Sequence, residues 1–197
     1  NDQAAEICSG TAFNVTPVNA PRGTTYTWAL PSVTPFNSIF GISNEVQGKD
    51  SVKQVLTNLT LSNGVAVYKV TANNSGCISN QFNATVTVLP LPRMTITGNS
   101  NVCKYPADTL TINFSGQSPW NFTYRDDSKA PVTISGITQT PYLLRLPEAV
   151  ANSMRRFSFT NISNAGCVNK SDTSYFTQII KPSPTGTIYS NYGNYLC

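Results

Sequence analysis

The chain has 197 residues, of which 11% are charged, and its formal net charge is +4. Soluble domains usually carry about 25% charged residues, and the small excess of base is not gathered in a cluster of Lys and Arg, which argues against a nucleic-acid partner. The chain contains no histidine, so it lacks a His general base, a Ser-His or Cys-His nucleophile pair and a His metal ligand. We therefore expect no enzyme activity and no cofactor. No apolar stretch approaches the ~20 residues of a membrane span, so this fragment should not insert into a membrane.

Residues 1–91 show the period-two alternation of half-buried strands. Apolar side chains alternate with polar ones at Tyr26 and Trp28, at Tyr68 and Val70, and along residues 82–88. One face of such a strand is buried and the other is wet. Thr, Val, Asn, Ser and Pro are plentiful in the chain, and they suit strands and turns rather than helices. The pattern predicts an all-β, immunoglobulin-like antiparallel β-sandwich.

A proline-rich break, Leu89-Pro90-Leu91-Pro92, precedes a second set of alternating strands. Pro fixes its own φ and restricts the residue before it, so this break is expected to be a semi-rigid spacer. Further strands are predicted near residues 108–115, 120–125, 140–146 and 154–162. A similar break begins at Lys181. We expect a second sandwich over residues 92–182, placed end to end with the first.

The cysteines fall into two interleaved series that share one period. Cys8, Cys103 and Cys197 are separated by 95 and 94 residues, while Cys77 and Cys167 are separated by 90. The three residues before Cys77 are Asn-Ser-Gly, and those before Cys167 are Asn-Ala-Gly. A fixed period of this kind marks a repeat architecture. It predicts one repeat over residues 1–91, a second over 92–182, and the start of a truncated third over 183–197.

Each predicted repeat has one early and one late cysteine, so the expected disulfides are Cys8–Cys77 and Cys103–Cys167, with Cys197 left without a partner. Four cysteines allow three pairings, and the pairing within each unit is chosen because a repeat must fold in the same way wherever it sits. Reduced cysteines in a cytosolic protein are one alternative. Metal binding is a weaker one, since no Cys-x-x-Cys pair occurs. Disulfides indicate an oxidising compartment or the cell exterior.

The expected Cys103–Cys167 bond also limits the number of strands between the two cysteines. An antiparallel strand crosses a sandwich from one end to the other, so an even number of full crossings must separate two loops at the same end. The four strands predicted between these cysteines meet that condition. Residues 128–138 are therefore expected to be an excursion that does not fully cross.

Two pairs of residues have both a structural and a functional interpretation. Asp126 and Asp127 sit where a strand should turn, and a turn is favoured over calcium binding or acid-base chemistry. Trp28 and Trp120 could stack on sugar rings. Both lie in apolar alternating strands, however, and sandwich cores commonly hold a Trp, so core packing is preferred for both.

Short segments throughout the chain share the pattern of a known kind of repeat. In the first unit they are Ile7-Cys8-Ser9-Gly10, Thr25-Tyr26-Thr27-Trp28, Ser75-Gly76-Cys77 and Ala84-Thr85-Val86-Thr87-Val88. In the second unit they are Ile96-Thr97-Gly98-Asn99, Val102-Cys103, Asp108-Thr109-Leu110-Thr111 and Ser118-Pro119-Trp120. The first unit resembles PKD-like repeats of giant cell-surface proteins from the Bacteroidota, and the second is similar to the partner repeat of those proteins.

The resemblance implies a location and a role. The best-known members of the group are SprB-type gliding adhesins, which are exported by the type IX secretion system and carried along the cell surface. It implies that this chain is an extracellular fragment of such an adhesin, acting as a stalk in surface adhesion and gliding motility. Asp50-Ser51-Val52 and Asp108-Thr109-Leu110 look like acceptor sites for O-glycans in these bacteria, which makes Ser51 and Thr109 candidate modification sites.

The expected partners are neighbouring repeats of the same chain, with surface glycans or the motility and secretion machinery as further candidates. The competing interpretation is a glycan-binding accessory module of a secreted multidomain enzyme. That role needs solvent-exposed aromatic side chains, so the burial of Trp28 and Trp120 separates the two. A stalk also predicts a maximum dimension well beyond that of a compact globule of this length, whose radius of gyration would be ~16 Å.

Overall fold

The computed structural model describes residues 1–103, 108–127, 129–148 and 150–182. Every helix-or-strand element within these residues is a β-strand, which confirms the predicted all-β fold. None of the described segments is a helix of the length and apolarity needed to cross a membrane. The predicted start of a third repeat, residues 183–197, lies outside the described residues, as does Cys197.

The first sandwich is built from β1 to β10 and ends at Leu89. Its strands are β1 (Gln3–Cys8), β2 (Thr11–Val15), β3 (Thr25–Trp28), β4 (Ser32–Thr34), β5 (Ile39–Phe40), β6 (Glu45–Lys49), β7 (Val52–Asn58), β8 (Gly64–Asn74), β9 (Cys77–Ile78) and β10 (Phe82–Leu89). The larger sheet has the order β1-β10-β8-β3-β6, with β4 and β9 also paired to β8, and the smaller sheet has the order β2-β7-β5. β1 runs parallel to β10, so that Cys8 lies opposite Leu89.

The second sandwich repeats this plan with β11 to β19. Its strands are β11 (Arg93–Thr97), β12 (Asn101–Cys103), β13 (Thr109–Ser115), β14 (Trp120–Asp126), β15 (Val132–Ile137), β16 (Tyr142–Arg145), β17 (Ser153–Ser163), β18 (Val168–Asn169) and β19 (Ser174–Lys181). The larger sheet has the order β12-β19-β17-β14-β15, with β18 paired to β17, and the smaller has the order β11-β13-β16. β12 runs parallel to β19, so that Cys103 lies opposite Lys181.

Each sandwich has its own hydrophobic core. The apolar residues that alternate along the predicted strands point inward, as Tyr26, Trp28, Tyr68 and Val70 do in the first sandwich. In the second core, Phe122 is fully buried against the rings of Phe114, Tyr124, Tyr142 and Phe159. Burying one face of every strand in this way is what holds two sheets together.

Two buried tyrosines of the first core differ in the state of their hydroxyl groups. Tyr68 donates a hydrogen bond of 2.7 Å to Oε1 of Gln54, whereas the hydroxyl of Tyr26 has no hydrogen-bond partner among the described residues. Burial raises the pKa of both phenols. An unpaired buried hydroxyl costs about 1–3 kcal/mol, and a typical hydrogen bond contributes about 1 kcal/mol.

Replacing Tyr26 by Phe is therefore expected to raise the free energy of unfolding by about 1 kcal/mol, because it removes a buried polar group that nothing satisfies. Replacing Tyr68 by Phe should lower the free energy of unfolding by about 1 kcal/mol, because Oε1 of Gln54 loses the shorter of its two hydrogen bonds and keeps only the one from the amide of Ser43. Urea unfolding of the two variants measures both changes. Equal losses in the two variants would contradict the assignment of the unpaired hydroxyl to Tyr26.

The predicted excursion over residues 128–138 is wrong. Residues Val132–Ile137 form β15, which pairs antiparallel with β14 from Trp120 opposite Ile137 to Tyr124 opposite Val132. Five strands, β13 to β17, thus lie between Cys103 and Cys167. An odd number of crossings puts these two cysteines at opposite ends of the sandwich.

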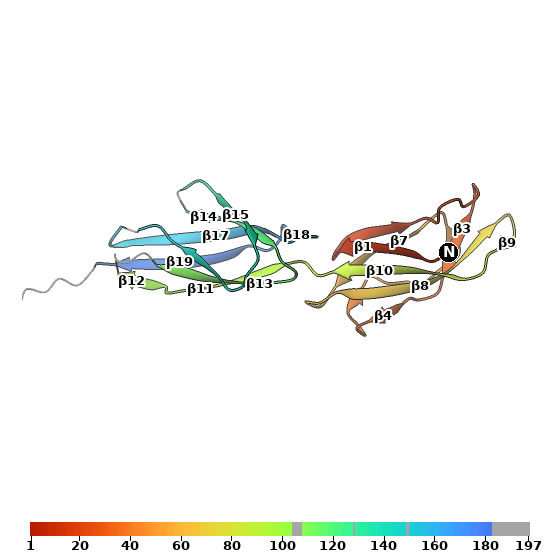
Figure 1. Ribbon diagram of the computed structural model, residues 1–197, viewed down its shortest axis with the longest axis horizontal. Helices are drawn as coiled ribbons and strands as arrows, with labels where there is room; N and C mark the ends of the chain where they lie inside the picture. Colours follow the sequence, from red (N-terminus) through yellow and green to blue (C-terminus); the bar gives the residue numbers. More distant parts are fainter. Residues whose placement is uncertain (104–107, 128, 149, 183–197) are drawn as a thin grey trace, which may run out of the picture.

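The two sandwiches follow one another along the long axis of the molecule (Figure 1). β10 of the first sandwich leads through the short segment Pro90-Leu91-Pro92 into β11 of the second. The cysteine-bearing elements β9 and β12 lie at the two outer ends, and β18 lies beside the junction. The junction is therefore where the two halves of the chain meet.

Candidate functional site: the junction between the sandwiches

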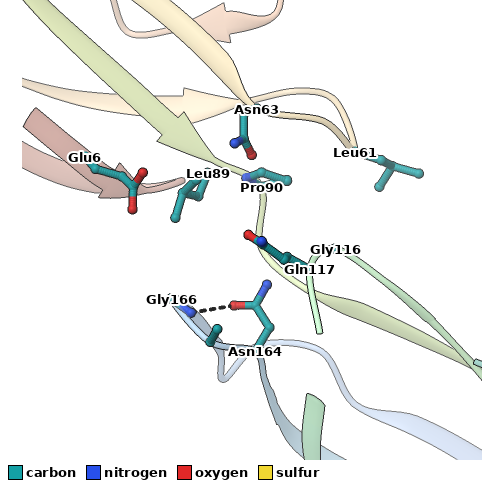
Figure 2. Close-up of a pocket in the computed structure, with 10 residues that line it drawn as sticks. Glu6, Leu61, Asn63, Leu89, Pro90, Gly116, Gln117, Asn164 and Gly166 are labelled. Atoms are coloured by element: carbon teal, nitrogen blue, oxygen red, sulfur yellow. Dashed lines mark hydrogen bonds between the residues drawn. The ribbon is translucent and has the colours of Figure 1, made fainter. Parts of the chain in front are cut away.

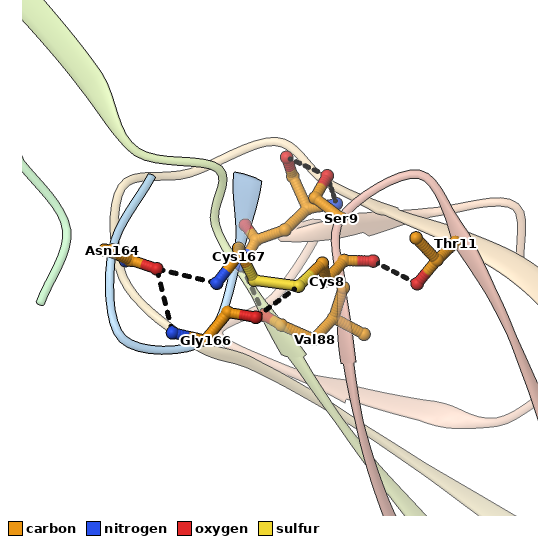
Figure 3. Close-up of a disulfide and its surroundings, with 8 residues drawn as sticks. Cys8, Ser9, Thr11, Val88, Asn164, Gly166 and Cys167 are labelled. Atoms are coloured by element: carbon orange, nitrogen blue, oxygen red, sulfur yellow. Dashed lines mark hydrogen bonds between the residues drawn. A yellow bond between two sulfur atoms is a disulfide. The ribbon is translucent and has the colours of Figure 1, made fainter. Parts of the chain in front are cut away.

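A disulfide between Cys8 and Cys167 crosses the junction (Figure 3). Cys8 is the last residue of β1, and the amide of the next residue, Ser9, donates a 2.8 Å hydrogen bond to the carbonyl of Leu89. Cys167 directly precedes β18 in the second sandwich. Their Cα atoms are 5.7 Å apart, within the range of ordinary disulfides. The bond joins residues 159 positions apart in the sequence.

The hairpin between β17 and β18 is shaped to present Cys167 to the first sandwich. Oδ1 of Asn164 accepts hydrogen bonds from the amides of Gly166, at 3.1 Å, and Cys167, at 2.8 Å. A Cβ atom at position 166 would lie 3.1 Å from Cδ1 of Leu89, which is closer than ordinary van der Waals contact. The glycine thus lets the hairpin approach the end of β10.

The expected pairings Cys8–Cys77 and Cys103–Cys167 are wrong, and the strand registers give the reason. Cys8 lies opposite Leu89 at the end of β10, whereas Cys77 follows β8, whose antiparallel pairing takes it to the start of β10. The eight residues of β10 span about 23 Å. A disulfide allows at most about 7 Å between Cα atoms.

The same reasoning separates Cys103 from Cys167. Cys103 lies opposite Lys181 at the end of β19, while the β17–β18 hairpin lies beyond the start of β19, since Phe159 pairs with Ser174. Cys77 and Cys103 are exposed and form no disulfide within the part of the chain that the structure describes. The sequence contained the repeat of cysteine positions but no indication of which end of a sandwich each would occupy.

The proline segment between the sandwiches is packed rather than free. Pro90 and Pro92 are buried, and the buried Asn169 donates a 3.0 Å hydrogen bond from Nδ2 to the carbonyl of Pro92. Oδ1 of Asn169 in turn accepts from the hydroxyl of Ser171 and the amide of Asp172. The linker is thus held by a side chain 77 residues further along the chain, a contact that local sequence does not indicate.

A polar cavity of about 440 Å³ opens at the junction, lined in part by the turn before Cys167 (Figure 2). It is lined from the first sandwich by Glu6, Leu61, Asn63, Leu89 and Pro90, and from the second by Gly116, Gln117, Asn164, Ala165 and Gly166. Glu6 is the one titratable side chain among these lining residues, and it is exposed. The described residues also contain no group of three or more metal-binding side chains. The lining offers amide hydrogen bonding and no nucleophile, base and acid set.

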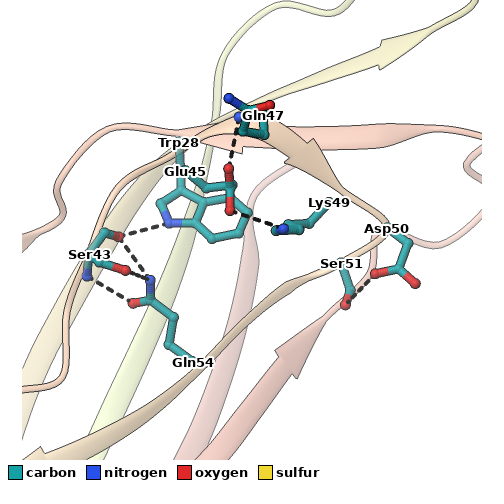
Figure 4. A network of polar contacts seen from close by, with 8 residues as sticks. All are labelled: Trp28, Ser43, Glu45, Gln47, Lys49, Asp50, Ser51 and Gln54. Atoms are coloured by element: carbon teal, nitrogen blue, oxygen red, sulfur yellow. Dashed lines mark hydrogen bonds and ion pairs between the residues drawn. The ribbon is translucent and has the colours of Figure 1, made fainter.

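The two tryptophans are core residues, as predicted. Trp28 is 5% exposed and Trp120 is 6% exposed. The indole of Trp28 donates a 3.0 Å hydrogen bond to the carbonyl of Ser43, whose hydroxyl and carbonyl also accept from Nε2 of Gln54 (Figure 4). Trp120 stacks on Phe114 with ring centroids 5.3 Å apart. Neither indole presents a face on which a sugar could stack.

Asp126 and Asp127 lie where the turn was predicted, and Asp126 also holds a buried ion pair. Its Oδ2 is 2.8 Å from Nη2 of Arg155 and 3.0 Å from Nζ of Lys129. Burial on its own would raise the pKa of Asp126, but the hydrogen bonds and charges of Arg155 and Lys129 outweigh it and hold this pKa below its ordinary value. The pair lies at the end of β14 and joins it to β17.

The two candidate O-glycosylation sites remain predictions. Ser51 is partly exposed in the bend between β6 and β7, with its hydroxyl 3.5 Å from the carboxylate of Asp50 (Figure 4). Thr109 is partly exposed at the start of β13. The carboxylate of the preceding Asp108 accepts a hydrogen bond from the buried Gln178, so Asp108 has a structural role whether or not Thr109 is modified.

Comparison with known protein families identifies the first sandwich. Residues 5–92 match the family described as PKD-like domain. The first sandwich is therefore similar to PKD-like domains. The match runs from within β1 to the end of β10, with the Pro90-Leu91-Pro92 segment, and thus covers one side of the junction. No match was found among curated proteins.

Several solved structures match over most of the chain, both sandwiches included. They include the N-terminal four Ig domains of Dscam1 isoform 8.4 (12% identity, 93% of this chain and 44% of that chain, TM-score 0.34) and the N-terminal eight Ig domains of Down Syndrome Cell Adhesion Molecule (14%, 92% and 23%, 0.43). A third is the CFA/I enterotoxigenic E. coli adhesin CfaE (8%, 94% and 98%, 0.33). This chain spans less than half the length of the first two. Similarities this low carry no inference about function.

Proposed function

We propose that this chain is a segment of the stalk of a secreted, repetitive cell-surface adhesin, and that it acts mechanically rather than catalytically. The observation that carries the proposal is the Cys8–Cys167 disulfide, which bonds one sandwich covalently to the next. A disulfide inside a domain stabilises that domain alone. A disulfide between two domains fixes their relative position, which is what a stiff stalk requires.

Other features of the junction support the same role. The linker prolines are buried and the carbonyl of Pro92 is bonded to Asn169, so three separate constraints act on one short connection. Inter-domain motion is the usual expectation for short linkers with small interfaces. Here the disulfide, the proline backbone and the Asn169 hydrogen bond all oppose it.

The setting of the stalk is part of the proposal. A disulfide between domains persists in an oxidising compartment, which supports an extracellular, cell-surface location. The sequence resemblance to SprB-type adhesins supports type IX export, an origin in the Bacteroidota and a part in gliding motility. The partners proposed for the segment are neighbouring repeats of the same kind.

Small-angle scattering and surface labelling test the stalk. Scattering from the purified chain should give a maximum dimension well beyond that of a compact 197-residue protein, and antibodies against the chain should label the surface of intact cells of the source organism. A compact envelope, or label only after the cells are opened, would overturn the proposal. Saturable binding on a glycan array would instead favour the accessory-module interpretation.

A further inference from the structure

Two kinds of cysteine position occur in this structure, and each occurs twice. The first kind is the end of the strand that runs parallel to the last strand of its sandwich. Cys8 occupies it in the first sandwich, opposite Leu89, and Cys103 occupies it in the second, opposite Lys181. In both, the partner residue is the last of its strand, β10 or β19. The two positions are equivalent in register as well as in sequence spacing.

The second kind is the short hairpin that follows the longest strand of each sandwich. Cys77 lies in the β8–β9 hairpin and Cys167 in the β17–β18 hairpin, and β8 and β17 are both 11-residue strands paired to the last strand. An exposed aliphatic residue follows each cysteine, Ile78 in one hairpin and Val168 in the other. The hairpin cysteine lies at the opposite end of its sandwich from the strand-end cysteine.

One cysteine of each kind is already bonded, and the bond joins unlike kinds. Cys8 is a strand-end cysteine and Cys167 a hairpin cysteine, and they belong to different sandwiches. The remaining two, Cys77 and Cys103, are exposed and unbonded among the described residues. The hairpin cysteine Cys77 belongs to β9 at one outer end of the molecule, and the strand-end cysteine Cys103 belongs to β12 at the other (Figure 1).

We propose that Cys77 and Cys103 are disulfide sites for further sandwiches of the same kind, placed before and after this chain. Cys103 would bond to the hairpin cysteine of the following sandwich, and Cys77 to the strand-end cysteine of the preceding one, each by the geometry seen at Cys8–Cys167. Such an interface is head-to-tail and does not close, so it extends as a filament. The inference goes beyond the proposed stalk, since it holds for any array of these sandwiches in an oxidising environment, whatever the role of the array.

The chemistry is a two-electron oxidation by a disulfide-bearing oxidant such as oxidised glutathione. One thiolate attacks the oxidant and releases one glutathione thiol, leaving a mixed disulfide on the protein. The second protein thiolate then attacks that mixed disulfide, forming the protein–protein bond and releasing the second glutathione thiol. Two protein thiols are oxidised while one oxidant disulfide is reduced to two thiols.

The test uses two variants of the full chain that can link only in one way. Both carry Cys197→Ser, and one also carries Cys77→Ser while the other carries Cys103→Ser. Each is incubated alone and then mixed with the other in an oxidised and reduced glutathione buffer, and disulfide-linked dimers are counted on non-reducing gels and mapped by mass spectrometry. We expect the Cys77–Cys103 heterodimer to exceed the two homodimers by about tenfold, which corresponds to ~1.4 kcal/mol of preference for docking.

A matched control moves the thiol by two residues within the same turn. Ser75 is exposed like Cys77, so a Cys77→Ser/Ser75→Cys chain offers an accessible thiol at the wrong place, and its yield with Cys103 should fall to the level of random pairing. Circular dichroism checks that all variants fold. Homodimers as abundant as the heterodimer, or an undiminished yield from position 75, would overturn the inference. Neither outcome depends on cellular location or on the shape in solution, so the stalk proposal is tested separately.

Discussion

Replacing both Cys8 and Cys167 by Ser is expected to lower the free energy of unfolding by about 5 kcal/mol. The bond closes a loop of 159 residues, and in the chain-entropy model a loop of that length restricts the unfolded chain by about this amount. Both cysteines are changed together, because a single thiol left at the junction could be oxidised to a new disulfide with Cys77 or Cys103. Guanidinium unfolding followed by tryptophan fluorescence measures the loss, since Trp28 and Trp120 report on different cores.

The same variant should also separate the unfolding of the two sandwiches. With the disulfide in place, the two sandwiches are joined covalently at Cys8 and Cys167. Without it, they are connected by the short proline segment and by the hydrogen bond from Asn169 to the carbonyl of Pro92. A Cys77→Ser/Cys103→Ser chain is the matched control, because these thiols are exposed and unbonded, and its stability should not change. An unaltered midpoint in the Cys8/Cys167 variant would show that the junction bond contributes nothing to stability.

Replacing Arg155 by Met is expected to destabilise the second sandwich by about 3 kcal/mol, because breaking the buried ion pair leaves Asp126 with only the exposed Lys129 as a counter-charge. Arg155 is 9% exposed and also donates from Nη1 to the carbonyl of Pro147. Its guanidinium lies 4.9 Å from the ring centre of Phe157. Thermal or chemical unfolding of the variant measures the loss of free energy of unfolding. Adding the change Asp126→Asn should recover part of that loss.

Arg156 provides the control for this prediction and pH a second readout. Arg156 is adjacent and exposed over Tyr175, so Arg156→Met should cost well under 1 kcal/mol. The pKa of Asp126 is lowered by folding from an ordinary 3.8. The ion pair therefore contributes its full stabilisation of the fold at any pH above the ordinary pKa of 3.8. This contribution is lost as the pH falls through the lowered pKa. The difference in free energy of unfolding between wild type and Arg155→Met should therefore shrink in strong acid. A difference that does not change with pH would contradict the ion pair.

Much of each core could be predicted from the sequence, because the alternation of side chains along a strand is a local property. Trp28, Tyr68 and Phe122 are all buried where the period of two puts them. The turn at Asp127 is equally local, since Asp favours turns by bonding its own neighbouring backbone. These predictions needed no knowledge of where one strand lies relative to another.

The disulfide could not be predicted in this way, because its geometry depends on which end of a sandwich each cysteine reaches. A repeat with one early and one late cysteine is satisfied equally by bonds within units and by bonds between successive units, and the sequence period is the same in both. The parity of strand crossings decides between them, because β15 brings the number of strands between Cys103 and Cys167 to five and so places these cysteines at opposite ends. The expected Cys103–Cys167 bond required an even number of strands, and this requirement excluded the strand Val132–Ile137.

The junction disulfide also determines how the chain would respond to tension. A pull applied to the two ends of the molecule enters at the first strand and passes from Cys8 directly to Cys167, so the residues between them lie outside the tensed path. Without the disulfide, unfolding of both sandwiches would let the residues between Cys8 and Cys167 extend to roughly 500 Å. With the disulfide intact, both sandwiches could unfold and the distance between the two pulled ends of the molecule would hardly increase. An array of sandwiches linked in this way resists extension through its covalent bonds rather than through the stability of each fold.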